Sequence, residues 1–597
     1  MLKDLPFTLP ALREAYASGI TPEQVITEAY ARLDAVDDPG IFISTDRSAA
    51  LRAARDLGTP DGRPLWGIPF AVKDNIDVAG QPTTAACPDF EYISDTDAFV
   101  VARLRAAGAI VLGKTNLDQF ATGLVGVRSP YPIPLNAIDP AIVPGGSSSG
   151  SGVVVAHGIA CFALGTDTAG SGRVPAALNS IVGLKPTLGA FSASGMVPAC
   201  RTLDTISVFA LTVADAWDVF AEAAAYDPED GYARKFPAPR ASAPAPVLRI
   251  GVPTPATLET FGDSVQEAAF RTALAELRTR GAILTEIDFT PFYDTARMLY
   301  EGAWVAERTA AMGARLTEKP ETIHPVTKGI VEQGLSLGAV DAFNGIYRLA
   351  DLRRKAEEAM EGLDLLCVPT IPHFVTLDEI AADPIGPNSR LGTYTNFVNL
   401  LDLCGMAVPT GHRSDGRPAS VTLLARAGED ARVAATAALI ESGDMGATGW
   451  ARPMAPEAPA LAPGEVAVAV CGAHMSGLPL NREIVDRGGR FLRTARTAPD
   501  YRFFALPDGK RPGLVRGASG SGAAIALEVW AMPATAFGSF VAGIPEPLGI
   551  GTVRLSDGSA VKGFVCEEAG TEGAADITGL GGWRAHLAQR DKAGGVA

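Results

Sequence analysis

Apolar residues between about residues 65 and 450 follow two alternating patterns, one typical of helices and one typical of strands. In the clearest case, Ser264 and Glu267 have the spacing of a helix-capping box, and apolar residues then recur at helical intervals. Gly281 is predicted to end this helix, and a strand is expected over residues 283–287. This stretch therefore predicts one helix followed by one strand.

Residues 100–112 show the same order. They predict a helix over 100–107, a stop at Gly108 and a strand over 109–112. Alternation of helices and strands over several hundred residues is typical of an α/β domain. We expect a mixed β-sheet core that is covered by helices.

The chain changes character near residue 451. The sequence ARPMAPEAPALAPG is dense in Pro and Ala, lacks periodicity and is typical of a semi-rigid linker. Short β-branched runs follow it, separated by turns that contain glycine. We predict an α/β domain over 1–450, a linker over 451–464 and a small β-rich domain over 465–597.

Length and charge narrow the function classes. At 597 residues the chain is too long for one ordinary domain, which agrees with this division. A formal net charge of -16 and the lack of a basic run argue against a nucleic-acid partner. No stretch of about 20 apolar residues and no signal-like start are present, so we expect no membrane segment and a cytoplasmic protein.

The spacing of the cysteines and histidines argues against the commonest metal sites and against a disulfide framework. The seven cysteines are scattered and form no CxxC pair, so neither disulfides nor a zinc site is predicted. None of the six histidines lies at metal-ligand spacing from another. We therefore expect no metal and no organic cofactor, and the chemistry must use other bases.

Two segments rich in glycine and hydroxyl groups stand out, PGGSSSGSG over 144–152 and GTDTAGSGRVP over 165–175. The first could be a flexible linker by composition alone. Closely flanking apolar residues, at 153–156 and 159–164, argue against a linker, because a solvated segment does not need them. Glycine and serine between core elements indicate backbone that lies close to a ligand.

The second segment predicts an oxyanion hole. Thr168, Ala169 and Gly170 precede Ser171, so successive backbone N–H groups, including that of Ser171, could point to one place beside the serine hydroxyl. His157 is the nearest histidine, but it lies in an apolar run and is interpreted as a core or helix-surface residue. The serine therefore needs a base of another type.

Lys73 is the candidate base, because it ends the apolar run GIPFAVK. Burial disfavours its charge, lowers its pKa and makes a neutral amine available as a proton acceptor. The alternative is a strand-end lysine that pairs with Asp74 or Asp77. Asp167 and Arg173, which flank the second segment, are expected to pair and to fix its loop.

Together, the GIPFAVKDN, PGGSSSGS and GTDTAGSGRVP segments resemble the amidase signature family, over about residues 25–450. The resemblance implies that Ser171 is the nucleophile, that Ser147 bridges and that Lys73 is the base. It also implies a cis peptide bond between Gly146 and Ser147. Ala169 and Gly172 depart from the commoner family wording, but neither removes a reacting group.

Three features resemble the allophanate hydrolase branch of this family. They are the residues Ala169 and Gly172, the run VPACRTLD that ends at Asp204, and the presence of a second domain. That branch implies a small anionic acyl-urea as substrate, with Tyr300 and Arg308 binding its carboxylate. The two residues are eight positions apart, so one continuous helix would place them on one face. The alternative is that Arg308 pairs with Glu301, Glu307 or another acid.

The tail resembles the second domain of the same branch, which is similar to a γ-glutamylcyclotransferase-like barrel. His474, in the run AVAVCGAHMSG, matches a histidine thought to take part in decarboxylation of the first product. A lone histidine after a strand can equally be structural, and in other relatives the domain serves assembly. Sequence leaves these roles open.

The resemblance thus predicts an enzyme that releases ammonia and carbon dioxide from allophanate, and it implies a homodimer. Two rivals remain. One is the glutaminase subunit of a tRNA-dependent amidotransferase, which shares the triad but has no use for the second domain. The other is a protein whose C-terminal domain mainly organises a multi-enzyme assembly.

Overall fold

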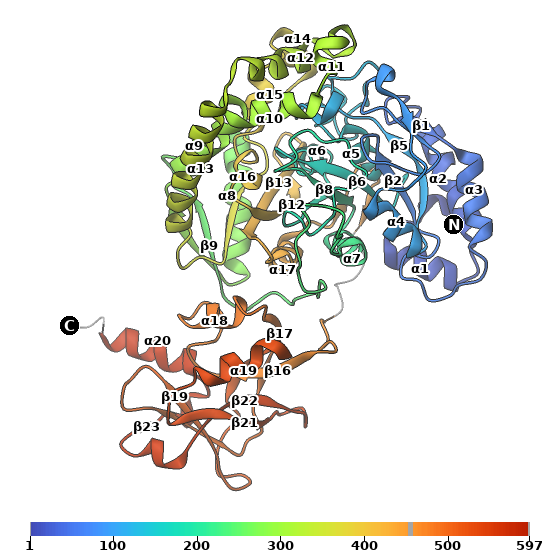
Figure 1. The fold of residues 1–597 in the computed structure, drawn as a ribbon. Helices are drawn as coiled ribbons and strands as arrows, with labels where there is room; N and C mark the ends of the chain where they lie inside the picture. The colour runs from blue at the N-terminus through green and yellow to red at the C-terminus, as the bar shows by residue number, and fades with distance from the viewer. Residues whose placement is uncertain (1, 452–457, 595–597) are drawn as a thin grey trace. The chain divides into compact units, whose positions relative to one another are not determined.

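The computed structural model describes residues 2–451 and 458–594, which form two compact units (Figure 1). The first unit comprises residues 2–239, 250–279 and 284–451, and the second comprises 240–249, 280–283 and 458–594. Most of the first half of the predicted linker, residues 452–457, lies outside the described residues. The units differ from the predicted division in that residues 240–249 and 280–283 group with the C-terminal part of the chain.

A mixed sheet of 11 strands organises the first unit, as the α/β prediction requires. Parallel and antiparallel neighbours both occur: β2 runs parallel to β5 and β6, whereas β12 is antiparallel to β7 and β13. In spatial order the strands are β1 (Phe42–Thr45), β5 (Ile110–Thr115), β2 (Pro69–Lys73), β6 (Phe162–Asp167), β8 (Thr205–Ala210), β7 (Val182–Lys185), β12 (Leu403–His412), β13 (Pro418–Arg426), β11 (Leu365–Pro369), β9 (Leu248–Pro253) and β10 (Ala282–Ile287).

Helices cover this sheet, and α9 and α13 run along the flank that lies opposite the N-terminal helices α1 to α3 (Figure 1). The helices are α1 (Leu9–Ala17), α2 (Pro22–Val36), α3 (Arg47–Asp56), α4 (Phe99–Ala106), α5 (Ser149–Ala156), α6 (Val174–Leu178), α7 (Val213–Ala223), α8 (Ser264–Thr279), α9 (Thr290–Glu301), α10 (Ala303–Met312), α11 (Arg315–Glu318), α12 (Pro325–Glu332), α13 (Ala339–Ala359), α14 (Leu377–Ala382), α15 (Gly386–Leu391), α16 (Phe397–Leu400) and α17 (Asp430–Ile440). The first unit also contains two small antiparallel strand pairs: β3 (Pro82–Thr83) with β4 (Tyr92–Ile93), and β14 (Asp444–Met445) with β15 (Trp450–Ala451). Every residue of β2, β6 and β8 is buried, so these strands show no alternation of buried and exposed positions.

Helix α8 begins and ends almost where the sequence predicts, but its N-cap differs. Asp263 Oδ1 accepts a hydrogen bond from the Gln266 N–H at 2.9 Å, so Asp263 caps the helix. The predicted capping box of Ser264 and Glu267 is therefore wrong, and Glu267 instead pairs with Arg271 at 2.6 Å. Gly281 follows the helix with a φ of 94°, in the left-handed region that favours glycine.

The second unit is β-rich, as predicted. Its five-stranded sheet contains β17 (Arg490–Arg496), β20 (Ala526–Pro533), β16 (Glu465–Val470), β22 (Ala560–Cys566) and β21 (Leu548–Arg554), and a three-stranded sheet contains β19 (Pro512–Arg516), β18 (Tyr501–Ala505) and β23 (Ala575–Asp576). Helices α18 (Asn481–Val485), α19 (Ala534–Ala542) and α20 (Trp583–Gly594) accompany them. Apolar side chains from both sheets form one buried cluster.

Within the part of the chain that the structure describes, no helix combines the length and the apolar character needed to cross a bilayer.

Candidate active site

Lys73 lies at the carboxyl end of β2, in contact with β6. Its Nζ is 2.8 Å from Ser147 Oγ and 2.7 Å from Thr166 Oγ1, and its side chain is fully buried. Burial lowers the pKa of Lys73 to about 7, so a large fraction of the amine is neutral near neutral pH. The candidate base thus contacts the Ser147 hydroxyl and has a pKa near neutrality.

The alternative for Lys73, an ion pair with Asp74 or Asp77, is not what the structure contains. Asp74 lies 3.6 Å from Lys114 Nζ instead. Asp77 accepts hydrogen bonds from Thr83 and Tyr92, at 2.9 and 2.7 Å. The lysine therefore faces hydroxyl groups rather than a carboxylate.

Ser147 lies in a fully buried segment, so the interpretation of residues 144–152 as a flexible linker is wrong. The peptide bond between Gly146 and Ser147 is cis, as the resemblance implies. The Ser147 carbonyl accepts from the Asp118 N–H at 3.0 Å, and the Gly146 N–H donates to the Leu124 carbonyl at 2.8 Å. A Cβ atom on Gly146 would lie 2.0 Å from Asp118 Oδ2, so no larger residue fits there.

Ser171 is buried and follows β6 by four residues. Its hydroxyl donates to the Gly123 carbonyl at 3.4 Å. Among the described residues, no hydrogen bond joins the Ser171 and Ser147 hydroxyls. A proton relay through Ser147 therefore requires the Ser171 hydroxyl to turn away from Gly123.

The loop before Ser171 is held by Asp167, the last residue of β6. Arg173 donates to both carboxylate oxygens from Nε and Nη2, each at 2.9 Å, and this confirms the predicted pair. Asp167 also accepts the N–H groups of Gly170 at 2.9 Å and Gly172 at 3.0 Å. The Gly170 N–H is therefore already engaged, and Thr168, Ala169 and Ser171 remain as the candidate oxyanion donors.

Two further residues hold this site, and neither could be assigned a role from the sequence alone. Thr166 accepts from Lys73, and Asp204 accepts from the Thr168 hydroxyl and from the N–H groups of Ala199 and Cys200. Burial raises the pKa of Asp204 to about 6. Both residues stand inside motifs that were noticed, but no spacing rule shows which side chains meet across strands.

The sequence predicts one helix that carries both Tyr300 and Arg308, but the structure contains two helices here. Tyr300 belongs to α9 and Arg308 to α10, and the extended backbone of Gly302 separates them. The prediction of one continuous helical face is therefore wrong. The two side chains still meet, because the Arg308 guanidinium lies 5.2 Å from the centre of the Tyr300 ring.

Arg308 is buried, with 2% of its surface exposed, yet its guanidinium is poorly satisfied. Nη1 is 3.5 Å from Thr122 Oγ1, and neither Nε nor Nη2 has a partner among the described residues. Glu307, one of the alternative partners, accepts from Thr202 and Cys200 instead. A buried guanidinium with two free donors is suited to bind a carboxylate in two places.

His474 lies in the second unit. Its ring stacks on Phe564, with the ring centres 4.9 Å apart, and its Nε2 is 3.4 Å from Glu483 Oε2. Burial lowers the pKa of His474, so the imidazole is mainly neutral near pH 7. His157 follows the last turn of α5, where its backbone N–H caps the helix.

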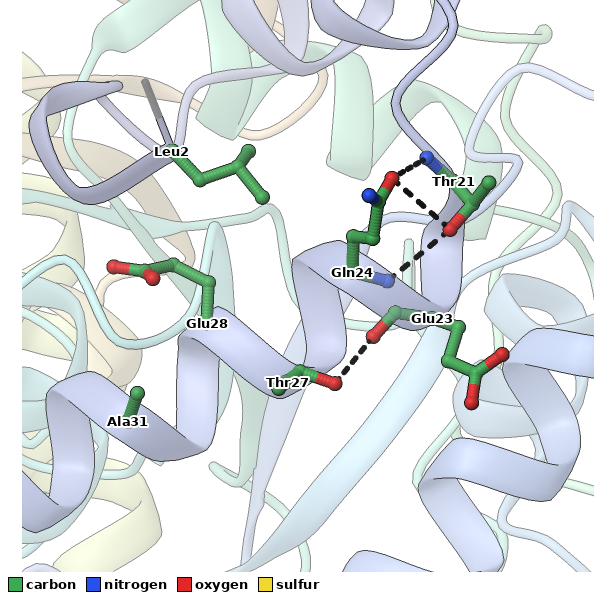
Figure 2. Close-up of a pocket in the computed structure, with 7 residues that line it drawn as sticks. All are labelled: Leu2, Thr21, Glu23, Gln24, Thr27, Glu28 and Ala31. Carbon is green, nitrogen blue, oxygen red and sulfur yellow. Dashed lines mark hydrogen bonds between the residues drawn. The ribbon is translucent and has the colours of Figure 1, made fainter.

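A surface hollow at the start of α2 is the pocket drawn in Figure 2. Thr21 and Gln24 there bond to each other as a capping box, and Thr27 donates to the Glu23 carbonyl. None of the residues that line this hollow is a catalytic candidate. In the described residues, no group of three or more His, Cys, Asp or Glu side chains is arranged to hold a metal ion.

Comparisons with known proteins identify the family of each part of the chain. The family model described as Amidase matches residues 24–434, and the one described as Allophanate hydrolase C-terminal domain matches residues 466–588. The structure of an allophanate hydrolase from Kluyveromyces lactis is 39% identical, has a TM-score of 0.78 and covers 98% of this chain and 100% of its own.

Urea amidolyase of Saccharomyces cerevisiae is 44% identical over 547 residues, which are 88% of this chain. The chain spans 30% of the length of that relative. A glutamyl-tRNA(Gln) amidotransferase subunit of Nitratidesulfovibrio vulgaris is 34% identical over 463 residues, 71% of this chain and 94% of its own length.

Proposed function

Because the chain belongs to the amidase family and ends in an allophanate hydrolase C-terminal domain, we propose that it hydrolyses allophanate through an acyl-enzyme on Ser171. Allophanate is a urea whose one nitrogen carries a carboxylate. The reaction releases ammonia from the free amide and then carbon dioxide from the remaining N-carboxylated product.

In the first step the Ser171 oxygen forms a bond to the urea carbonyl carbon. The Ser171 proton passes through Ser147 to neutral Lys73 and then to the departing nitrogen, so the C–N bond breaks and ammonia leaves. Free N–H groups in the loop at 168–171 stabilise the oxyanion, with each donor worth about 3 kcal/mol of barrier. Water then cleaves the ester by the same relay in reverse, which frees N-carboxycarbamate.

The observation that carries the substrate assignment is the buried, half-satisfied guanidinium of Arg308. It lies beside Thr122, the residue before Gly123, whose carbonyl binds the Ser171 hydroxyl. A carboxylate on the substrate would satisfy the two free nitrogens and, with Tyr300, would orient the amide toward Ser171.

The rivals fit the chain less well. The amidotransferase relative matches 71% of this chain, whereas residues 466–588 match an allophanate hydrolase domain that the glutaminase proposal does not use. A protein that only organises a multi-enzyme assembly would need neither the lowered pKa of Lys73 nor the hydrogen-bonded loop of Ser171.

A substrate panel tests the proposed function. The purified chain is given allophanate, malonamate and glutamine, and ammonia is measured, with Ser171→Ala as the control. We expect rapid release from allophanate, slower release from malonamate, little from glutamine and none with Ser171→Ala. Preference for glutamine would instead favour the amidotransferase proposal.

The C-terminal unit is proposed to accelerate the second step, with His474 passing a proton to the nitrogen of N-carboxycarbamate as the C–N bond breaks and carbon dioxide leaves. A neutral imidazole with a carboxylate partner, Glu483, can relay a proton in this way. An assembly role for this unit remains the alternative.

His474→Ala separates these two roles. Decarboxylation predicts unchanged release of the first ammonia but slower release of carbon dioxide, measured by stopped flow with a pH indicator. Wild-type carbon dioxide kinetics in this variant would favour assembly.

A homodimer is the proposed oligomeric state, and an apolar stripe on α13 supports it. Val340, Phe343, Ile346 and Tyr347 lie on one side of this helix and are 51 to 73% exposed. A two-fold axis would lay the stripe of one copy against the stripe of a second copy, so that both apolar surfaces would leave water. The stripe thus fits a second copy of this chain.

A further inference from the structure

The peptide unit between Gly123 and Leu124 is bound on both sides. Its carbonyl, which belongs to Gly123, accepts the Ser171 hydroxyl at 3.4 Å. Its N–H, which belongs to Leu124, donates to Asn388 Oδ1 at 2.8 Å. Because a peptide unit is planar, one orientation sets both bonds.

Asn388 is therefore joined to Ser171 through a single rigid group, although it lies 264 positions from Leu124 in the sequence. It belongs to α15 and is buried, with 4% of its surface exposed. The same segment holds this loop at a second point, because the Pro384 carbonyl accepts from Arg128 Nη2 at 2.9 Å. The loop cannot rotate without breaking bonds to this segment.

The bond to Asn388 also changes the electronic character of the carbonyl. A hydrogen bond to the N–H of a peptide increases the negative charge on its oxygen, and this strengthens the bond that the oxygen accepts. When Ser171 turns to attack, the same oxygen is left free in a fixed orientation. It can then accept from the N–H groups of the amide that is being cleaved.

We infer that Asn388 is a positioning residue for the nucleophile: it fixes the Gly123–Leu124 peptide, whose carbonyl holds the Ser171 hydroxyl and then the leaving amide nitrogen. This inference rests on the proposed function only in taking Ser171 as the nucleophile. It predicts a loss in the rate of acylation rather than in substrate affinity, because Asn388 touches no reacting atom.

A matched pair of variants tests it. Asn388→Leu has the same branching but no acceptor, and it leaves the buried Leu124 N–H unpaired. Asn388→Asp keeps an acceptor oxygen in either protonation state. Asn136→Leu, a buried amide that bonds the Val143 and Leu178 carbonyls, reports the general effect of such a loss on the fold.

Labelling of Ser171 by a fluorophosphonate is the main readout, because it reports serine reactivity whatever the natural substrate is. We expect labelling by Asn388→Leu to slow by about tenfold to a hundredfold, as for other displaced reacting groups. Asn388→Asp should return to within about threefold of the wild type, by comparison with that range. Thermal unfolding is measured in parallel, and Asn388→Ala replaces the leucine variant if that variant does not fold.

Equal labelling by Asn388→Leu and the wild type would overturn the inference, as would an Asn388→Asp variant that is as slow as Asn388→Leu. So would an equal loss in Asn136→Leu. A wild type that labels at Ser171 but releases no ammonia from allophanate would contradict the proposed function alone, and the labelling comparison would still decide the role of Asn388.

Discussion

Asp167 and Arg173 hold the loop of the proposed nucleophile, Ser171, without a part in the proposed reaction. Both side chains are fully buried, and the carboxylate accepts from two backbone N–H groups as well as from the guanidinium. Burial alone would raise the pKa of Asp167, but the facing Arg173 holds it below its ordinary value. The loop that carries Ser171 is therefore built around one ionised carboxylate.

Arg173→Met should destabilise the protein strongly, because it leaves that carboxylate buried without its partner. The expected cost is about 3–5 kcal/mol, measured by denaturant unfolding. Arg354→Met is the control, since Arg354 and Glu358 are 76 and 66% exposed and such a pair contributes less than about 1 kcal/mol. Equal costs for the two variants would show that the buried pair does not hold the loop.

The candidate reacting residues could be selected from the sequence, whereas the residues that contact them could not. Lys73, Ser147 and Ser171 stand in motifs whose composition is unusual enough to be noticed. Thr166 and Asn388 make their contacts across 93 and 264 positions of the sequence. Such contacts depend on which strands and loops become neighbours, and a single sequence contains no record of that.

At the scale of elements, the pattern of apolar residues located helices and strands well but located their interruptions poorly. The strand that carries Lys73 and the glycine stops at Gly108 and Gly281 were predicted correctly. The break at Gly302 was missed, because the residues on both sides of it favour a helix. Arg308 nevertheless reaches Tyr300, because α9 and α10 pack against each other.

Arg308→Ala should weaken hydrolysis of carboxylated amides far more than that of neutral ones. We expect kcat/KM for allophanate and malonamate to fall by about a hundredfold, which corresponds to the loss of a paired, charge-assisted contact. For neutral amides the expected change is less than about threefold, since that contact is absent there. Arg308→Lys keeps the charge but loses the planar fork of donors. Its kcat/KM for the carboxylated amides should therefore lie between the values for the wild type and for Arg308→Ala.

Steady-state kinetics on allophanate, malonamate and a simple amide such as propionamide give this comparison. If Arg308→Ala reduces all three by the same factor, Arg308 has a structural role and the carboxylate is bound elsewhere.

At the scale of the whole molecule, composition and the Pro/Ala-rich stretch were enough to predict a large α/β part and a β-rich tail. They did not show that residues 240–249 belong with the tail. Ala243 donates to the Phe491 carbonyl, and Arg490 donates to the Ala241 carbonyl. Removal of the C-terminal part would therefore take the bonding partners from an internal segment, so point variants are the better test of its role.

Phe343→Glu should separate the proposed homodimer into single chains. A charge in the middle of the apolar α13 stripe would have to be buried without a partner in the pair of helices. Sedimentation velocity should then show the mass of one chain, with first-step ammonia release retained. Lys355→Glu, on the same helix but on a different side from the stripe, is the control. An unchanged dimer in Phe343→Glu would mean that the copies meet elsewhere or not at all.

Neutral Lys73 is proposed to remove the proton of Ser171 through Ser147. The pH dependence of Ser171 acylation tests this role, and it is measured in single turnovers with malonamate by rapid quench and mass spectrometry. Since burial lowers the pKa of Lys73 to about 7, and only the neutral amine accepts a proton, the rate should rise with pH through about 7 and level off above it, with Lys73→Met almost inactive at every pH. A rate that is flat across this range, a rate that falls as pH rises, or an acyl group on another residue would show that Lys73 is not the base for Ser171.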